Sequence, residues 1–318
     1  MGKRSKKRKP NYARMLFFAL LITSIVGIVS NVESIGSYFK VKLLSTENPL
    51  FYTDVIENPS TDDYIQIVKE QADIYKGEQI LVNNDISCEF MKNDSLVSLY
   101  DNKNAAYQVK DKNVLLSKHI IEPLNNMLND FYQACGPNSL IVVSGYRTSE
   151  FQQALYNERV SEEGAVEAAK WVAQPGRSEH HTGLALDFSL YFGDGTSEDY
   201  DGTGKYQWIN NNAYEYGFIV RYDESKKDIT KIYYEPWHFR YVGVPHSYII
   251  AQNNFCFEEY IDYLRGYEYG ENHLEVSCDG IKYVIYFTKD TNIYIPKNKE
   301  YQISGNNVDG FIVTVQVS

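Results

Sequence analysis

Three short segments of the sequence hold residues that together could perform hydrolysis at a metal ion. They are Ser178–Asp187 (SEHHTGLALD), Glu235–His238 (EPWH) and Ser144–Arg147 (SGYR). A catalytic zinc ion takes three protein ligands, typically His nitrogens or carboxylate oxygens, and keeps a fourth position open for water. His180, Asp187 and His238 could supply that set.

The local pattern favours a common face for these ligands. Asp187 lies in an apolar stretch with strand character, and His180 precedes a Thr-Gly turn that can fold the chain back toward Asp187. Along the second predicted strand, His238 alternates with Trp237 and Phe239. His238 can therefore face the metal while Trp237 faces the core or a substrate cleft.

Two further residues suit the chemistry of a carboxypeptidase. Glu235 precedes His238 by three residues, and a helical turn opened by Pro236 would place both on one side. A carboxylate beside the metal can act as general base. Arg147 stands where a predicted strand gives way to a helix, and its guanidinium can grip a free C-terminal carboxylate with two hydrogen bonds.

Each of these residues also has an ordinary structural explanation. A single His is more often a core or surface residue than a ligand, Arg147 alone most often forms a salt bridge, and Asp187 can cap a turn. Gln152 and Ser178 can equally serve only as caps. The interpretation as a site depends on several specific spacings that occur together and in order.

The combined motif is Ser-Gly-Tyr-Arg, then Ser-x-His-x-x-Gly-x-Ala-x-Asp, then Glu-x-x-His, and it resembles the LAS group of zinc peptidases. Within that group it is most similar to the VanY-type D-alanyl-D-alanine carboxypeptidases, over about residues 115–250. The resemblance implies zinc ligands, a catalytic base, a holder of the substrate carboxylate, and residues that bind the terminal D-alanine. The implied zinc ligands are His180, Asp187 and His238, and the implied catalytic base is Glu235. Arg147 would hold the substrate carboxylate, and Gln152 and Ser178 would bind the terminal D-alanine. Trp237 is added as a substrate-binding residue.

The resemblance also implies an α+β fold of the hedgehog/DD-peptidase type, with a central, mostly antiparallel sheet. The implied activity is Zn²⁺-dependent removal of the C-terminal D-alanine from peptidoglycan stem peptides. An L,D-carboxypeptidase, a dipeptide-releasing enzyme or an endopeptidase stays open, and so does a zinc-stabilised surface-binding module without turnover. Arg147 favours an exopeptidase, and Glu235 argues against the module. His181 departs from the family's more frequent glutamine, and His246 is a spare ligand candidate.

The sequence around the motif predicts alternating helices and strands. Helices are expected at 117–132, 149–160 (capped by Ser149 with Gln152), 164–172 and 206–216, with a further short helix at 64–75. Strands are expected at 140–143, 184–188, 218–221 and 237–242, and in the tail at 283–287, 293–295 and 311–315. Residues 193–204 are expected to form a polar loop.

The N-terminus predicts a membrane anchor. Seven Lys and Arg residues and no acid occur in residues 1–14, and residues 15–31 are uncharged and apolar. A membrane-spanning helix needs roughly 17–25 such residues, and basic flanks stay in the cytoplasm. The body should therefore face outward, although a cleaved signal peptide is the competing interpretation. The expected domains are a stalk and lead-in (32–112), the zinc peptidase (113–250) and a β-rich extension (251–318).

Charge and cysteine content complete the expectations. The net charge is −11 despite the basic N-terminus, so the body is strongly acidic and nucleic acid is a poor partner. The sequence leaves the oligomeric state open. The four cysteines could pair as Cys256–Cys278 and Cys88–Cys135, or remain thiols.

Overall fold

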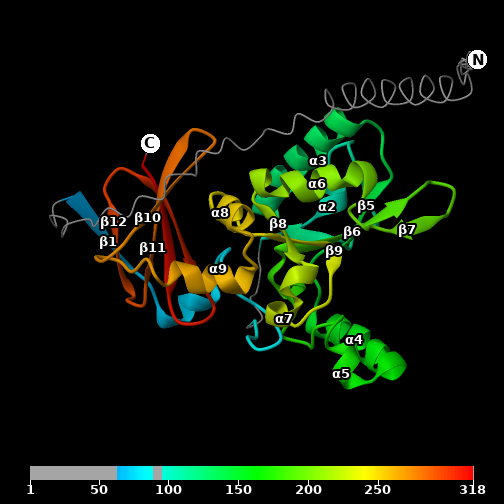
Figure 1. Ribbon diagram of the computed structural model, residues 1–318, viewed down its shortest axis with the longest axis horizontal. Coiled ribbons are helices and arrows are strands. Elements are labelled where there is room, and N and C mark those ends of the chain that lie inside the picture. Colours follow the sequence, from blue (N-terminus) through cyan, green and yellow to red (C-terminus); the bar gives the residue numbers. More distant parts are fainter. Residues whose placement is uncertain (1–62, 89–94, 318) are drawn as a thin grey trace, which may run out of the picture. The chain divides into compact units, whose positions relative to one another are not determined.

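A six-stranded sheet lies at the centre of the computed structural model, which describes residues 63–88 and 95–317 (Figure 1). Its strands follow the order β3 (Gln108–Val109), β5 (Leu140–Ser144), β6 (Ala185–Tyr191), β9 (Glu235–Tyr241) and β8 (Phe218–Tyr222), and β7 (Ser197–Asp199) also pairs with β6. The β3–β5 pair is parallel and the other pairs are antiparallel. The predicted α+β fold with a mostly antiparallel sheet is therefore confirmed.

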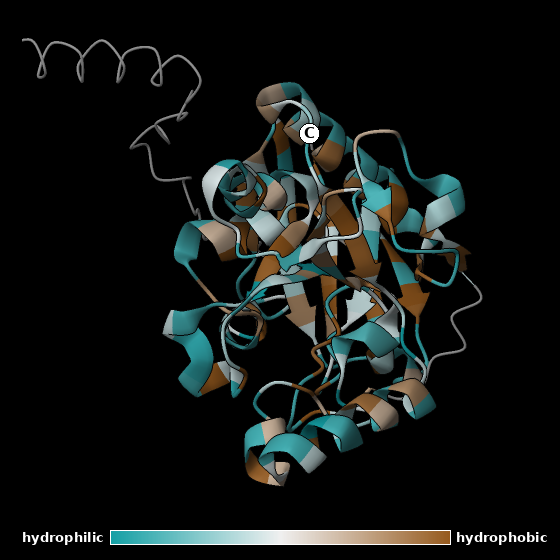
Figure 2. Cartoon of the chain, turned by 90° about the vertical axis from the view of Figure 1, so that its right-hand side faces the viewer, coloured by the Kyte–Doolittle hydropathy of each residue, from teal (hydrophilic) through white to brown (hydrophobic). Residues whose placement is uncertain are grey.

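Helix α3 (Ile121–Cys135) packs on this sheet through one apolar face. Its buried side chains recur every three or four residues: Ile121, Leu124, Met127, Leu128 and Phe131. They share one hydrophobic cluster with Leu140 and Val142 of β5, and each fully buried side chain of this kind contributes about 1.5–3 kcal/mol. Pro123 lies in the first turn, where its missing N–H costs little, and Gly136 at φ +73° ends the helix. Figure 2 shows that hydrophobic residues are concentrated on strands in the interior of the protein.

Helix α4 (Ser149–Glu163) begins directly after the segment that carries Arg147. Its N-cap is Thr148, whose hydroxyl accepts a hydrogen bond from the Phe151 amide, so the predicted cap by Ser149 with Gln152 is wrong. Gln152 is buried instead and donates from Nε2 to the Ala173 carbonyl at 2.7 Å. Helix α5 (Ala165–Ala168) is shorter than the predicted helix at 164–172.

The remaining elements between residues 95 and 264 are short. They are β2 (Leu96–Ser98), α2 (Leu99–Asn102), β4 (Leu115–Ser117), η3 (Lys118–Ile120), η4 (Glu179–Thr182), η5 (Gly204–Tyr206), α6 (Gln207–Asn212), η6 (Ala213–Tyr216), η7 (Glu224–Lys226), α7 (Lys227–Thr230), α8 (His246–Asn253) and α9 (Phe257–Leu264). The predicted helix at 206–216 is thus divided between 3₁₀ and α turns. The predicted loop at 193–204 contains β7, because its backbone finds partners along β6.

Residues 274–316 form strands, as predicted for the tail. Strands β10 (Leu274–Cys278), β11 (Ile281–Thr288), β14 (Phe311–Gln316) and β13 (Glu300–Gly305) form an antiparallel sheet in that order, and β12 (Asn292–Pro296) pairs with β1 (Tyr64–Val68). The predicted helix at 64–75 is therefore wrong. Its first half is strand β1, rich in β-branched residues, and a 3₁₀ turn, η2 (Gln71–Tyr75), follows.

The segment Ile303–Asn307 of the extension forms hydrogen bonds with the lead-in, and we call this segment the clasp. Asn307 is buried and donates from Nδ2 to the carbonyls of Leu81 at 2.7 Å and Ser87 at 2.9 Å. The Ser304 hydroxyl accepts a hydrogen bond from the Gln79 amide at 2.9 Å. Part of the predicted stalk and lead-in (32–112) thus packs against residues more than two hundred positions away. The domain boundaries themselves stay a prediction.

We expect Asn307→Ala to lower the free energy of unfolding by about 1–3 kcal/mol, because two carbonyls would lose their donor. Urea denaturation of the full-length chain measures this change, and the exposed Asn211→Ala variant is the matched control. An Asn307→Ala protein as stable as wild type would contradict a stabilising role for the clasp.

The four cysteines all lie in the described residues, and no disulfide joins any two of them. The structure therefore agrees with the thiol alternative and not with the pairs Cys256–Cys278 and Cys88–Cys135.

The predicted basic segment (1–14) and transmembrane anchor (15–31) lie outside the described residues. Within residues 63–88 and 95–317, no helix is both long and apolar enough to cross a bilayer.

Candidate active site

Asp187 and His238 are neighbours across the central sheet. They lie opposite one another between β6 and β9, and residues opposite one another in an antiparallel pair project to the same face. Oδ1 of Asp187 is 3.0 Å from Nδ1 of His238. On its other edge, β6 pairs Asp187 with Ser144 of β5, which brings the Ser144–Arg147 segment to the same place.

His180 reaches this face from the 3₁₀ turn η4. Gly183, at φ +71°, ends the turn in the left-handed conformation that glycine adopts freely, and the chain then enters β6. The Nδ1 atom of His180 lies 2.6 Å from the Gly145 carbonyl oxygen, so Nδ1 carries the proton and donates it. Nε2, with its lone pair, then faces Oδ2 of Asp187 at 3.2 Å.

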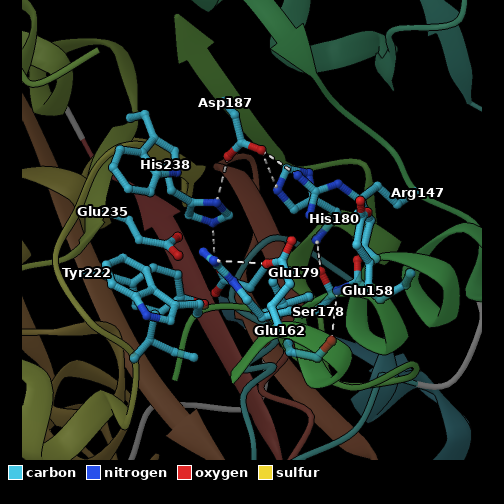
Figure 3. A pocket seen from close by; sticks show the side chains of 18 residues that line it. Arg147, Glu158, Glu162, Ser178, Glu179, His180, Asp187, Tyr222, Glu235 and His238 are labelled. Atoms are coloured by element: carbon cyan, nitrogen blue, oxygen red, sulfur yellow. Dashed lines mark hydrogen bonds and ion pairs between the residues drawn. The ribbon is translucent and has the colours of Figure 1, made fainter. Parts of the chain in front are cut away.

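The structure thus brings together the three predicted metal ligands. One ligand atom from each of His180, Asp187 and His238 lies within 4.8 Å of the others, and all three residues are buried. Figure 3 shows Asp187 between the two imidazole rings and in contact with both. Two imidazoles and one carboxylate are a donor set of catalytic zinc, and the Gly145 carbonyl holds His180 in the tautomer that a ligand requires. The residues present therefore fit a zinc ion.

The surroundings affect the two histidines in opposite directions. Burial lowers the pKa of His180 to about 4, and the Arg147 charge acts in the same direction, so this ring is neutral at pH 7. Burial alone would also lower the pKa of His238, but its contacts with Asp187 and Glu179 raise that pKa to about 9. A cation bound at the cluster would displace the His238 proton, because metal and proton compete for the same lone pair.

Glu235 enters the same cavity because β9 is irregular. Val220 lies opposite Phe239 and Tyr222 opposite Glu235, so β9 holds two more residues than β8 between these pairs. In a regular strand, residues three apart face opposite sides. The irregularity lets Glu235 and His238 line one cavity, and the helical turn predicted at Pro236 is not present. Figure 3 shows the Glu235 carboxylate pointing into this cavity beside His238.

Arg147 is held at the rim of the cluster. Its Nε donates to the Ser144 hydroxyl at 3.0 Å, and Nη2 donates to Oδ2 of Asp187. Burial alone would raise the pKa of Asp187, but its contacts with His180 and with the Arg147 guanidinium keep that pKa well below its ordinary value. Asp187 is therefore ionised at pH 7, as a metal ligand must be.

The other predicted residues line the same cavity of about 360 Å³, namely Gln152, Ser178 and Trp237. The Ser178 hydroxyl caps η4 through the His180 amide. The Oε1 atom of Gln152 is buried and has no hydrogen-bond partner in the described structure.

The remaining histidines do not join the cluster. His181 is buried, where its Nδ1 lies 2.8 Å from the Arg147 carbonyl and its Nε2 accepts the Gly176 amide. His181 is not part of the group of three residues that could hold a metal ion. The spare candidate His246 is also buried, between the hydroxyls of Tyr260 at 2.6 Å and Thr314 at 2.9 Å.

The sequence interpretation missed Glu179, between Ser178 and the candidate ligand His180. Its side chain is fully buried, and Oε2 lies 3.3 Å from Nε2 of His238. The only sequence signal was an acidic residue next to a candidate metal ligand. Tyr222 was missed too; its ring lies 5.1 Å from that of His238.

The metal-free protein should lose stability as pH rises, through Glu235. Burial raises the pKa of this carboxyl from an ordinary 4.5 to about 8, so the folded state binds its proton more tightly than the unfolded state. This contribution is complete below pH 4.5 and is lost as pH rises through 8. We expect metal-free Glu235→Gln to exceed wild type in unfolding free energy on the order of 1–4 kcal/mol at pH 9, and to differ little at pH 5. Urea denaturation at both pH values measures the difference; a variant less stable than wild type at pH 9 would contradict this.

Comparisons with known proteins agree with this geometry. The family model described as VanY, D-alanyl-D-alanine carboxypeptidase, matches residues 113–244. A D-alanyl-D-alanine carboxypeptidase of Enterococcus faecium is 38% identical over 314 residues, which cover 95% of this chain and 96% of that protein. One from Enterococcus faecalis is 34% identical over 66% of this chain and 75% of its own length. The crystal structure of the vancomycin-resistance D,D-dipeptidase VanXYg, in complex with a D-Ala-D-Ala phosphinate analogue, is similar with a TM-score of 0.71 and 35% identity, over 80% of this chain and 99% of that one. The chain therefore belongs to the VanY family of D-alanyl-D-alanine carboxypeptidases.

Proposed function

We propose that this protein is a zinc-dependent D,D-carboxypeptidase that removes the C-terminal D-alanine from peptidoglycan stem peptides. The observation that carries the proposal is the meeting, in one cavity, of a His₂Asp cluster, the buried Glu235 carboxylate and the Arg147 guanidinium. Membership of the family supports the same reaction.

Glu235 is the residue that moves protons. Zinc, when bound, supplies a Lewis acid for the scissile carbonyl and makes water acidic near neutral pH. Glu235 takes the proton of the attacking water and then passes it to the amine of the departing D-alanine. Its burial favours the protonated form between these two transfers.

Arg147 and the polar wall of the cavity place the substrate. Two of the Arg147 nitrogen atoms are engaged by Ser144 and Asp187, and a guanidinium offers five N–H donors in all, so others can reach a substrate carboxylate. Gln152 and Ser178 stand beside it in the cavity, and Trp237 forms part of the wall. Because an arginine at this place binds a free carboxylate, the substrate is cut at its C-terminal residue.

A peptide assay tests the proposal. The zinc-loaded full-length protein is incubated with a stem pentapeptide ending in D-Ala-D-Ala, and mass spectrometry follows the product, with a chelator-treated sample as control. Loss of one alanine, abolished by chelation, is the expected result. No cleavage by a protein with zinc bound would contradict the proposal and favour a non-catalytic surface-binding module.

Dipeptide hydrolysis is the second candidate, because VanXYg, a D,D-dipeptidase, has a similar structure. Free D-Ala-D-Ala and a stem tetrapeptide are therefore assayed in parallel. Hydrolysis of the free dipeptide in preference to the pentapeptide would assign a dipeptidase. Loss of D-alanine from the tetrapeptide would assign an L,D-carboxypeptidase.

We further propose that the peptidase region acts outside the cytoplasm and that residues 15–31 anchor it to the membrane. The support is the order of a basic segment before an uncharged apolar one, together with a substrate class that belongs to the cell wall. Protease treatment of intact spheroplasts tests this. Digestion of the C-terminal extension without lysis is expected, and complete protection until lysis would contradict it.

A further inference from the structure

Glu179 has an unusual position for a carboxylate. Its side chain has no exposed surface, and it lies on the side of the His238 ring opposite Asp187. Nδ1 of His238 faces Oδ1 of Asp187 at 3.0 Å, and Nε2 faces Oε2 of Glu179 at 3.3 Å. Each of the two ring nitrogen atoms of His238 therefore faces a different carboxylate.

Two arginines hold the other oxygen of Glu179. Oε1 accepts hydrogen bonds from Nε of Arg221 at 2.8 Å and from Nη1 of Arg240 at 3.0 Å. Both arginines are almost completely buried, at 1% and 0% exposure. Glu179 is thus a permanent acceptor, and a ring nitrogen that faces it must donate.

The arginines are themselves fixed by parts of the chain outside the motif. Arg240 donates from Nη2 to the carbonyls of Glu78 at 2.9 Å and Ile80 at 3.0 Å, in the lead-in that the C-terminal clasp holds. Arg221 forms two parallel hydrogen bonds to the carboxylate of Glu258 in α9, at 2.9 Å and 2.6 Å. Glu179 therefore has little freedom to turn.

We propose that Glu179, held by Arg221 and Arg240, is a positioning residue that keeps the Nε2 proton on His238 and so directs the Nδ1 lone pair to the metal. This inference rests on the proposed zinc site. A carboxylate that accepts the second ring N–H of a metal-bound histidine fixes its tautomer and orientation, and losing such a partner commonly costs 10–100-fold in metal affinity.

The Glu179→Gln variant tests this inference, because Arg221 and Arg240 fix the orientation of the new side-chain amide. The amide oxygen has to take the place of Oε1, where two guanidinium groups donate. The amide NH₂ then faces Nε2 of His238, which would have to accept, and the ring proton would move to Nδ1. The variant keeps the shape of the side chain, removes its negative charge and reverses the direction of its hydrogen bond with His238.

Zinc affinity of the full-length chain is the readout, measured by competition with a chromophoric chelator. We expect Glu179→Gln to bind zinc about 10–100-fold more weakly than wild type. Glu258→Gln is the matched control: it removes a carboxylate charge from Arg221 but leaves the Glu179–His238 contact in place, so its zinc affinity should stay close to that of wild type. Circular dichroism establishes that each variant is folded.

Four outcomes would overturn the inference. Folded Glu179→Gln could bind zinc as wild type does, or Glu258→Gln could lose as much affinity as Glu179→Gln. A wild-type protein without zinc affinity would refute the proposed function as well, which distinguishes the two failures. If Glu179→Gln does not fold, ¹⁵N NMR of the wild-type histidine rings decides: the inference requires a zinc-bound Nδ1 and a protonated Nε2 on His238, and the reverse assignment would refute it.

Discussion

Glu235→Gln should reduce turnover of the pentapeptide by about 10²–10⁴-fold, the range that a single general base commonly contributes. The amide keeps the size of the side chain but has no basic oxygen to take a proton from water. Glu235 also lies outside the group of three residues that could hold the metal, so the variant should keep its zinc. The loss should appear in kcat, because Arg147 and the polar wall that bind the substrate are unchanged.

The comparison of Glu235→Gln with wild type needs a control variant that loses the same charge but keeps the catalytic residues. Glu198→Gln, exposed on β7 of the same sheet, makes the same substitution away from the cavity and should retain wild-type kcat. Zinc content is measured for all three proteins. A zinc-loaded Glu235→Gln enzyme with wild-type kcat would show that another group moves the proton.

Asp187→Ala should have a still larger effect, since it removes a metal ligand. The cluster would keep two imidazoles, whereas catalytic zinc sites use three protein ligands. His180 and His238 would also lose the carboxylate that both contact. We expect the bound zinc to fall well below one ion per chain and turnover to fall to the level of the chelated protein.

Arg147 makes this variant informative in a second way. Asp187→Ala leaves the Arg147 guanidinium without its carboxylate partner, so the variant should also be less stable than wild type in the metal-free state. Asp199→Ala, on exposed β7, is the matched control. Full zinc occupancy in Asp187→Ala would show that the metal is held elsewhere.

The extension and the lead-in are connected to the active site by contacts and not by sequence proximity. Ser304 and Asn307 hold residues 79–87, and residues 78 and 80 receive the guanidinium of Arg240. Arg240 in turn reaches Glu179 beside a candidate metal ligand.

The sequence by itself determined the chemistry of the site. Ligand types, their order and their spacing reflect what a metal ion requires of side chains, and these requirements are visible in single residues. Strongly periodic elements such as α3 and β5 were predictable for a similar reason, because a buried face leaves a local apolar pattern.

Only the tertiary structure decided the features that depend on partners far away in the chain. The irregularity in β9 that lets Glu235 and His238 share a cavity is defined by its pairing with β8. Residues 64–68 became a strand because β12, more than two hundred residues later, supplies their hydrogen bonds. Glu179 became part of the site through Arg221 and Arg240, since a carboxylate can be buried only where charges elsewhere in the fold compensate it.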